Sequence, residues 1–144
     1  YVPNNTLRLL TGSGMGLGMA LMIFPAFNQT VWADGVEKPA IPGWKAFGLL
    51  VGIQVIFDLL VLSEIPVVLY PVAIISALGV WLLLTMVYSM VWVMIMGQDN
   101  KFTKLRQLWL PLLAGLTIAM IQTAAIDALR LWLTGTWGAF PLGK

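Results

Sequence analysis

Long apolar segments separated by short polar ones dominate the pattern of the chain. Four of them stay apolar over about 20 residues, the length that a helix needs to cross the hydrocarbon core of a bilayer. They cover residues 7–27, 46–62, 72–96 and 108–133. None alternates apolar and polar residues with a period of two, which argues against a membrane β-barrel. The pattern therefore predicts an all-α integral membrane protein with four transmembrane helices.

The segments between these predicted helices are short, as in an antiparallel bundle. Residues 63–71, between the second and third helices, contain Glu64, Pro66 and Pro71. Because proline interrupts a helix, this connection favours a tight helical hairpin. One long broken helix is the alternative. The longest connection, residues 28–44, is rich in turn-forming Gly, Pro and Asp residues.

The composition supports membrane insertion and one domain. The chain has 144 residues, of which 60% are apolar and 10% are charged. An average soluble domain has about 45–50% apolar and about 25% charged residues. The balance excludes intrinsic disorder and a charged, water-soluble surface. No basic run is present, so we expect no nucleic-acid partner.

The positions of the basic residues predict an orientation. With four spans, both termini lie on one side, together with Arg8, Arg130 and Lys144. The other side carries more cations, and three of them share one short connection. They are Lys38, Lys45, Lys101, Lys104 and Arg106. We therefore expect the long loops on the cytoplasmic side and both termini opposite. We expect no signal peptide at the start, and an additional upstream helix would reverse this orientation.

Ionisable residues inside the predicted helices are the best candidates for a site, because charge within a bilayer is costly. Asp58 lies in the second helix, one turn after Gln54, and Asp127 and Arg130 lie in the fourth. In an antiparallel bundle they approach the same membrane edge, where Arg8 enters the first helix. The structural interpretation is a set of ion pairs between helix ends. The functional interpretation is a polar site for a proton, a cation or a lipid headgroup, centred on Asp58.

The first predicted helix carries small residues at a spacing of four. Gly12, Gly16 and Ala20 form one such series, and Gly14 and Gly18 form a second. Small residues at this spacing let two helix backbones approach each other closely in a membrane. The pattern predicts a helix-packing face, with the partner helix in this chain or in another. A dinucleotide-binding loop is rejected, because no strand precedes the glycines.

Further polar and sulfur-containing residues recur along the predicted helices. Gln54 and Gln122 are long enough to bridge the second and fourth. Methionines form two stripes, Met15, Met19 and Met22 in the first helix, and Met86, Met90 and Met94 in the third. Thioethers suit Cu(I), so a copper path is the alternative to ordinary packing. Since the chain has no Cys and no His, packing is favoured, and histidine- or cysteine-ligated metal, haem or pigment is excluded.

These features favour a protein without catalytic residues, metal or cofactor. We expect a structural or accessory subunit, or an assembly factor, of a larger membrane complex. Its partners are then the lipid bilayer with bound lipid, and other membrane subunits or further copies of the chain. The alternative is a small ion-coupled transporter that uses Asp58 and Gln54. An enzyme acting on lipid or isoprenoid substrates is disfavoured, because no Asp-x-x-Asp pair is present.

Overall fold

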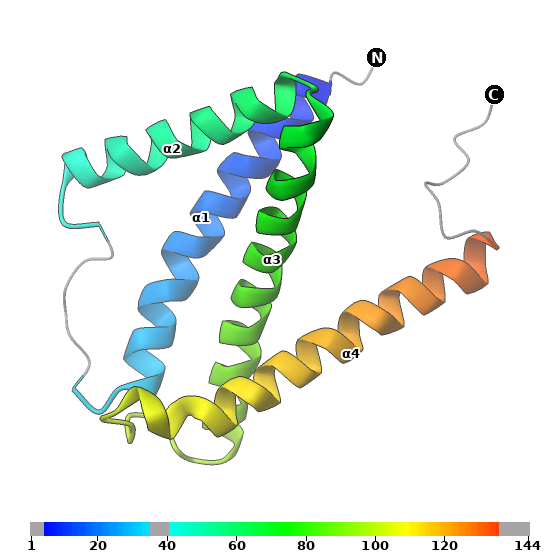
Figure 1. Cartoon of the computed structure of the whole chain (residues 1–144). Coiled ribbons are helices and arrows are strands. Elements are labelled where there is room, and N and C mark those ends of the chain that lie inside the picture. Colours follow the sequence, from blue (N-terminus) through cyan, green and yellow to red (C-terminus); the bar gives the residue numbers. More distant parts are fainter. Residues whose placement is uncertain (1–4, 35–40, 136–144) are drawn as a thin grey trace.

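The computed structural model describes residues 5–34 and 41–135, which form four long helices and one short helix (Figure 1). The long helices are α1 (Asn5–Val31), α2 (Trp44–Leu62), α3 (Pro66–Ile95) and α4 (Trp109–Thr134), and the short 3₁₀ helix η1 (Leu105–Leu108) leads into α4. All four are long and apolar enough to cross a membrane. The fold is all-α, as the sequence predicts. Lys38 and Lys144, used for the orientation, lie outside the described residues.

Two helices are longer than the sequence pattern predicts, and each continues through a proline that the pattern takes as a boundary. Helix α1 continues through Pro25 to Val31. Helix α3 begins at Pro66 rather than near residue 72, and Pro71 lies inside it. Proline is tolerated in the first turn, where its missing N–H has no intrahelical partner to lose. A turn at residues 63–65, where Glu64 has a φ of 53°, separates α2 from α3, so the two form a hairpin rather than one broken helix.

A glycine ends α3. Gly97 has a φ of 60°, a left-handed conformation in which a side chain would be strained. Its N–H donates to the carbonyl of Met94 at 3.1 Å, and the N–H of Gln98 donates to that of Val93 at 2.9 Å. This pair of bonds is a Schellman motif, which satisfies the last carbonyls of a helix. It turns the chain sharply toward the end of α1.

The loop after α3 then caps the end of α1. The N–H of Asn100 donates to the carbonyl of Thr30 at 2.9 Å, and the N–H of Phe102 donates to that of Val31 at 3.3 Å. In return, the N–H of Ala33 donates to the carbonyl of Phe102 at 3.0 Å. These bonds satisfy carbonyls that a helix end leaves unpaired. They explain why α1 extends beyond its apolar stretch.

A small hydrophobic core lies at this end of the molecule, where α1 and α3 end and α4 begins. Its buried members are Phe27, Val31, Val93, Phe102 and Leu108. Met86 and Met90 pack against it, which is the role of flexible apolar fillers. Elsewhere, large apolar side chains on all four long helices are exposed. Exposed apolar surface of this extent is typical of membrane-spanning helices or of helices that contact a partner.

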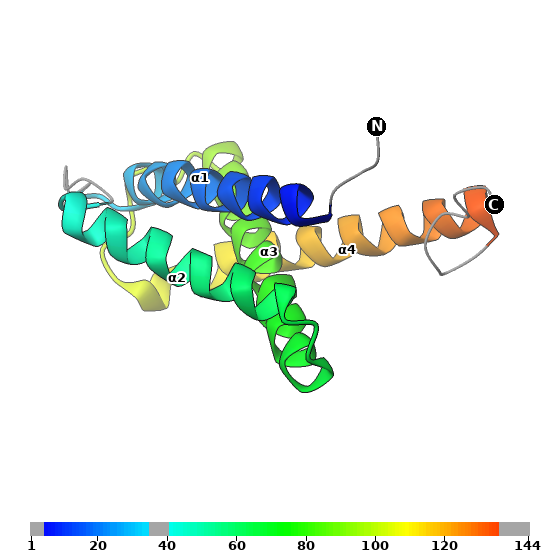
Figure 2. The same cartoon turned by 90° about the horizontal axis from the view of Figure 1, so that it is seen from above.

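The helices form an open arrangement. Helices α1, α2 and α3 contact one another, whereas α4 contacts α3 and η1 but neither α1 nor α2 within the described part of the chain. In Figure 1, α4 leads away from α1 and α2 toward the C-terminal end of the described chain, and the view from above shows it extending past the other long helices (Figure 2). The expected bundle is thus not closed between its first and last helices. One face of α4 packs within the chain, and the rest of it does not.

Candidate functional site

A polar cluster joins α1 to α2. Asp58 is buried, with 4% of its surface exposed. The hydroxyl of Ser13 donates to Asp58 Oδ2 at 2.9 Å, and Gln54 Nε2 donates to Ser13 Oγ at 3.1 Å. We call these three residues the α1–α2 polar cluster. It is a chain of side-chain hydrogen bonds that ends on a buried carboxyl group.

The local sequence explains how these side chains meet. Gln54 and Asp58 are four residues apart, so they lie on one face of α2. Ser13 stands between Gly12 and Gly14 on α1, and small neighbours allow helices to approach. A Cβ at Gly14 would lie 3.9 Å from Gln54 Nε2, which is ordinary van der Waals contact. The crossing therefore has room for the side chain of Gln54.

Ser13 has two acceptors within reach of its one proton. Besides Asp58 Oδ2, Ser13 Oγ lies 3.2 Å from the backbone carbonyl oxygen of Leu10. A hydroxyl group donates one hydrogen bond and accepts two. Ser13 was missing from the residues predicted from sequence. One feature of the sequence could have indicated Ser13. It carries a hydroxyl group between two glycines of α1, where the small residues let α1 approach the helix that carries Asp58.

The other predicted site residues do not join this cluster. Asp127 and Arg130 lie on α4, and α4 contacts neither α1 nor α2 in the described structure. Arg8 is exposed on α1, and no bond joins it to Asp58 among the described residues. The predicted ion pairs of Asp58 with Arg8 or Arg130 are therefore not found among the described residues, whereas the predicted convergence of these charges at one membrane edge stays a prediction. The ion pairs assumed a closed bundle, whereas α4 leans away from the other helices.

The predicted bridge between Gln54 and Gln122 is also absent, because each glutamine has another partner. Gln54 bonds Ser13 on α1. Gln122 on α4 accepts a short hydrogen bond from the hydroxyl of Tyr88 on α3. The two amides thus belong to separate helix pairs, and each contributes to a different interhelical contact.

The contact between α3 and α4 is built on one close approach. The hydroxyl of Ser89, which is 1% exposed, lies 2.6 Å from the carbonyl oxygen of Thr85 and 3.0 Å from that of Pro111. A Cβ at Gly115 would lie 2.5 Å from the Thr85 oxygen and 2.8 Å from the Ser89 nitrogen, and it would also overlap Ser89 Oγ. Only glycine fits here without a shift of the backbone. This glycine, which the sequence analysis missed, sets the distance between the two helices.

The small-residue face of α1 has little contact within the chain. At Gly12, Gly16 and Gly18, no neighbouring atom of the described chain lies within 4 Å of the position that a Cβ would take. Only Gly14 meets a side chain, that of Gln54. The predicted packing face therefore has no helix of this chain along most of its length.

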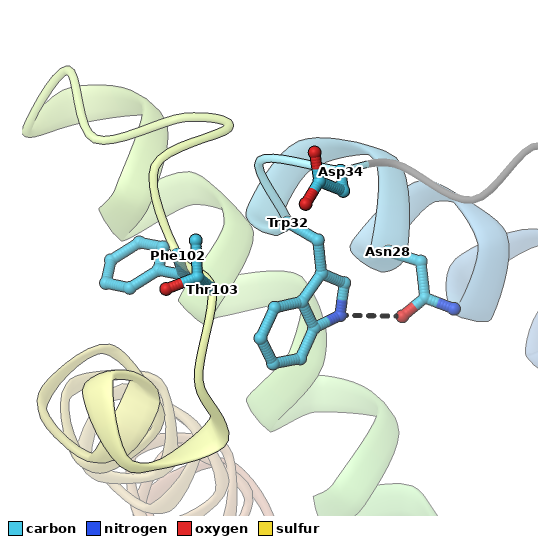
Figure 3. A pocket seen from close by; sticks show the side chains of 5 residues that line it. All are labelled: Asn28, Trp32, Asp34, Phe102 and Thr103. Carbon is cyan, nitrogen blue, oxygen red and sulfur yellow. Dashed lines mark hydrogen bonds between the residues drawn. The ribbon is translucent and has the colours of Figure 1, made fainter.

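A shallow pocket of about 350 Å³ lies where the end of α1 meets the loop after α3 (Figure 3). Its lining residues are Asn28, Trp32, Asp34, Phe102 and Thr103. The indole Nε1 of Trp32 donates to Asn28 Oδ1 at 3.2 Å. Among the described lining residues, Asp34 is the one titratable group. A lone carboxylate provides no acid–base pair, so the pocket offers less chemistry than the α1–α2 polar cluster.

Metal-binding potential is low among the described residues. No group of three or more Asp, Glu, His or Cys side chains lies close enough there to hold a metal ion. Met15, Met19 and Met22 are exposed on α1. Met86 and Met90 pack on the core, so the contacts shown by the α3 stripe are packing contacts.

No family model matches the chain, and neither a curated protein nor a solved structure resembles it significantly. Its function therefore has to be inferred from its own residues. The α1–α2 polar cluster and the unpartnered glycine face of α1 are the features that bear most directly on it.

Proposed function

We propose that the chain is a multi-pass membrane protein that serves as a non-catalytic structural or accessory subunit of a larger membrane complex. The observation that carries this proposal is the glycine face of α1. Gly12 and Gly16 lie one turn apart on the same side of α1 with open space beside them, and in a bilayer such a face is stabilised by the close approach of another helix. A partner subunit would supply that helix.

The open position of α4 supports the same proposal. Helix α4 packs on α3 alone among the long helices, and apolar side chains such as Ile121, Ile126 and Leu129 are exposed along it. Lipid chains or neighbouring helices can cover this surface. An accessory subunit that holds other subunits in place needs such accessible helix faces, and it does not need catalytic side chains.

Gentle detergent extraction, native-gel separation and mass spectrometry of the co-migrating chains test this function. We expect the chain to run in a large complex with fixed stoichiometry. A chain that runs alone, or as a small homo-oligomer, would contradict the proposal. The natural membrane is the right starting material, because the partner is identified by the experiment itself.

A matched pair of glycine variants tests the observation that carries the proposal. Gly16→Leu fills the face of α1, whereas Gly79→Leu adds the same side chain to α3. Neither glycine has a neighbouring atom within 4 Å of its Cβ position, so both variants should fold alone. We expect Gly16→Leu to lose the complex and Gly79→Leu to keep it. Equal behaviour of the two variants would show that the glycine face is not the interface.

The orientation belongs to the same proposal. Lys101, Lys104 and Arg106 lie in the connection between α3 and α4, so the positive-inside rule places this connection in the cytoplasm. The chain has no Cys, and single cysteines can therefore be labelled without background. On sealed right-side-out vesicles, a membrane-impermeant maleimide should react with Ser63→Cys and spare Thr103→Cys. The reverse pattern would invert the topology.

A second function is favoured by the burial of Asp58, which is rare and expensive for a carboxyl group within a membrane helix. We propose as the alternative a small ion-coupled carrier that uses Asp58 and Gln54. In reconstituted vesicles, Asp58→Asn should abolish transport or its pH dependence and leave assembly intact. If the variant loses assembly or shows no effect, the carrier function is disproved.

A further inference from the structure

The hydrogen bonds around Asp58 have two complete arrangements. With the carboxyl group ionised, the Ser13 hydroxyl donates to Asp58 Oδ2 across 2.9 Å. With the carboxyl group protonated, the same 2.9 Å separation lets Asp58 Oδ2–H donate to Ser13 Oγ. The Ser13 hydroxyl then donates to the carbonyl oxygen of Leu10, which is 3.2 Å away. Both arrangements leave the Ser13 hydroxyl with one acceptor for its single proton.

Gln54 fits both arrangements. Its Nε2 donates to Ser13 Oγ at 3.1 Å, and the hydroxyl oxygen has two acceptor sites. In the ionised state one of these accepts from Gln54. In the protonated state the second accepts from Asp58. Gln54 therefore holds the oxygen of Ser13 in place while its proton changes partner, and the contact between α1 and α2 persists.

The charged and titratable groups around this cluster do not tie Asp58 to a fixed charge. The elements that contact α2 are α1 and α3. They carry Arg8 on α1 and Tyr70 and Tyr88 on α3, while α2 itself carries Lys45 near its start, and Glu64 follows its end. None of these groups forms a hydrogen bond or ion pair with Asp58 in the described part of the chain.

Asp58 lies close to one end of α2. Asp58 lies four residues before Leu62, the last residue of α2, which is about 6 Å along a helix axis. Ser13 and Gln54 are half-buried, so the cluster is only partly shielded from its surroundings. The carboxyl group lies near the end of its helix and not at the middle.

We propose that Asp58 and Ser13 form a site that reversibly binds one proton, with Gln54 as the positioning residue. A proton from water adds to Asp58 Oδ2, the Ser13 O–H turns from Asp58 to the carbonyl of Leu10, and no other bond changes. Release of the proton reverses both steps. In the proposed carrier, this site would be the one that binds the coupling proton, and its physiological use rests on that proposed function. Proton binding itself requires neither transport nor a partner subunit.

The test is an infrared pH titration of the purified full-length chain in detergent, following the C=O stretch of protonated carboxyl groups. We expect a titrating band that is retained in Asp99→Asn, an exposed loop variant, and lost in Asp58→Asn. If the unmodified chain and Asp58→Asn show the same band at every pH, so that no part of it belongs to Asp58, the proposal is overturned. Because no membrane complex is present, failure here is distinguishable from failure of the subunit function.

A second variant pair keeps the proposal falsifiable if Asp58→Asn does not fold. Ser13→Ala removes the switching hydroxyl, whereas Thr11→Val removes a hydroxyl that bonds only the carbonyls of Leu7 and Arg8 on its own helix. We expect the midpoint of the Asp58 band, identified by ¹³C-labelled aspartate, to move in Ser13→Ala and to stay in Thr11→Val. An unchanged midpoint in Ser13→Ala would show that the hydroxyl has no part in proton binding.

Discussion

Two of the polar contacts between helices are built on a serine, yet they differ in what that serine can do. Ser89, between α3 and α4, is buried and bonds two backbone carbonyls, of Thr85 and Pro111. Ser13, between α1 and α2, is half-buried and bonds side chains that can change charge or rotate. Backbone partners fix a helix pair in one geometry, whereas side-chain partners let a contact change its protonation. Only the α1–α2 polar cluster, of these two serine contacts, contains a carboxyl group, which is why the proton-binding proposal concerns it.

The glycines at the two contacts differ in the same way. Gly115 lies against the backbone of α3, with no room for a Cβ, whereas Gly14 faces the end of the Gln54 side chain across 3.9 Å. Backbone atoms do not move aside without a shift of the whole helix, but the far end of a glutamine does. The comparison predicts a large difference between the same substitution at the two sites.

Gly115→Ala should produce the largest loss of stability. The added methyl group overlaps Ser89 Oγ and lies 2.5 Å from the Thr85 carbonyl oxygen, and such overpacking costs about 3 kcal/mol. Equilibrium unfolding in mixed detergent micelles measures this loss of stability. Gly52→Ala on α2, which has open space beside it, is the control. Loss of less than about 0.5 kcal/mol in Gly115→Ala, the range of an ordinary surface change, would show that α4 does not approach α3 this closely.

Ser89→Ala should have a smaller effect. It removes the hydrogen bond from α3 to the carbonyl of Pro111 on α4, and interhelical bonds in membrane proteins contribute about 0.6 kcal/mol, with a maximum near 1.7. Because Ser89 is fully buried, we expect a loss of about 1 kcal/mol in the same unfolding measurement. Thr117→Val, which removes a hydroxyl bonded only to Leu113 on its own helix, should lose less. If the two variants lose equally, the bond across the helices contributes nothing specific.

Much of this fold follows from the apolar pattern, because segments of about 20 apolar residues determine where membrane helices form. The segments at 7–27 and 46–62 lie within α1 and α2. The ends of the helices were less predictable. The extension of α1 to Val31 depends on carbonyl bonds from Asn100 and Phe102, and these residues are distant in sequence. A local pattern contains no information on such a cap.

The candidate site was predicted in part, for a related reason. Asp58 and Gln54 stood out because charge and amide groups are costly inside a membrane helix. Their partner Ser13 did not, because a single hydroxyl is common in such helices. Asp127 and Arg130 were placed beside Asp58 on the assumption of a closed bundle. Crossing angles arise from close contacts such as that of Gly115, and residue type alone does not give them.

Tyr88→Phe sharpens the comparison further, because it removes a neutral side-chain bond from the α3–α4 pair. The hydroxyl of Tyr88 bonds Gln122 Oε1, and both side chains are partly buried. We expect a loss of about 0.6 kcal/mol, the average for an interhelical bond in a membrane protein. A double-mutant cycle with Gln122→Met isolates the pair. Additive losses would show that the two groups do not interact.

Gly14→Ala should have the smallest effect and completes the comparison with Gly115→Ala. The new methyl group meets Gln54 Nε2 at an ordinary contact distance of 3.9 Å, and alanine favours a helix over glycine by about 1 kcal/mol. The free energy of unfolding should therefore stay the same or rise slightly, and the infrared titration of Asp58 should not move. A loss of stability comparable to that of Gly115→Ala would mean that α1 and α2 pack as tightly as α3 and α4. The α1–α2 polar cluster would then be as rigid as the α3–α4 pair, with no room for Ser13 to change its hydrogen-bond partner.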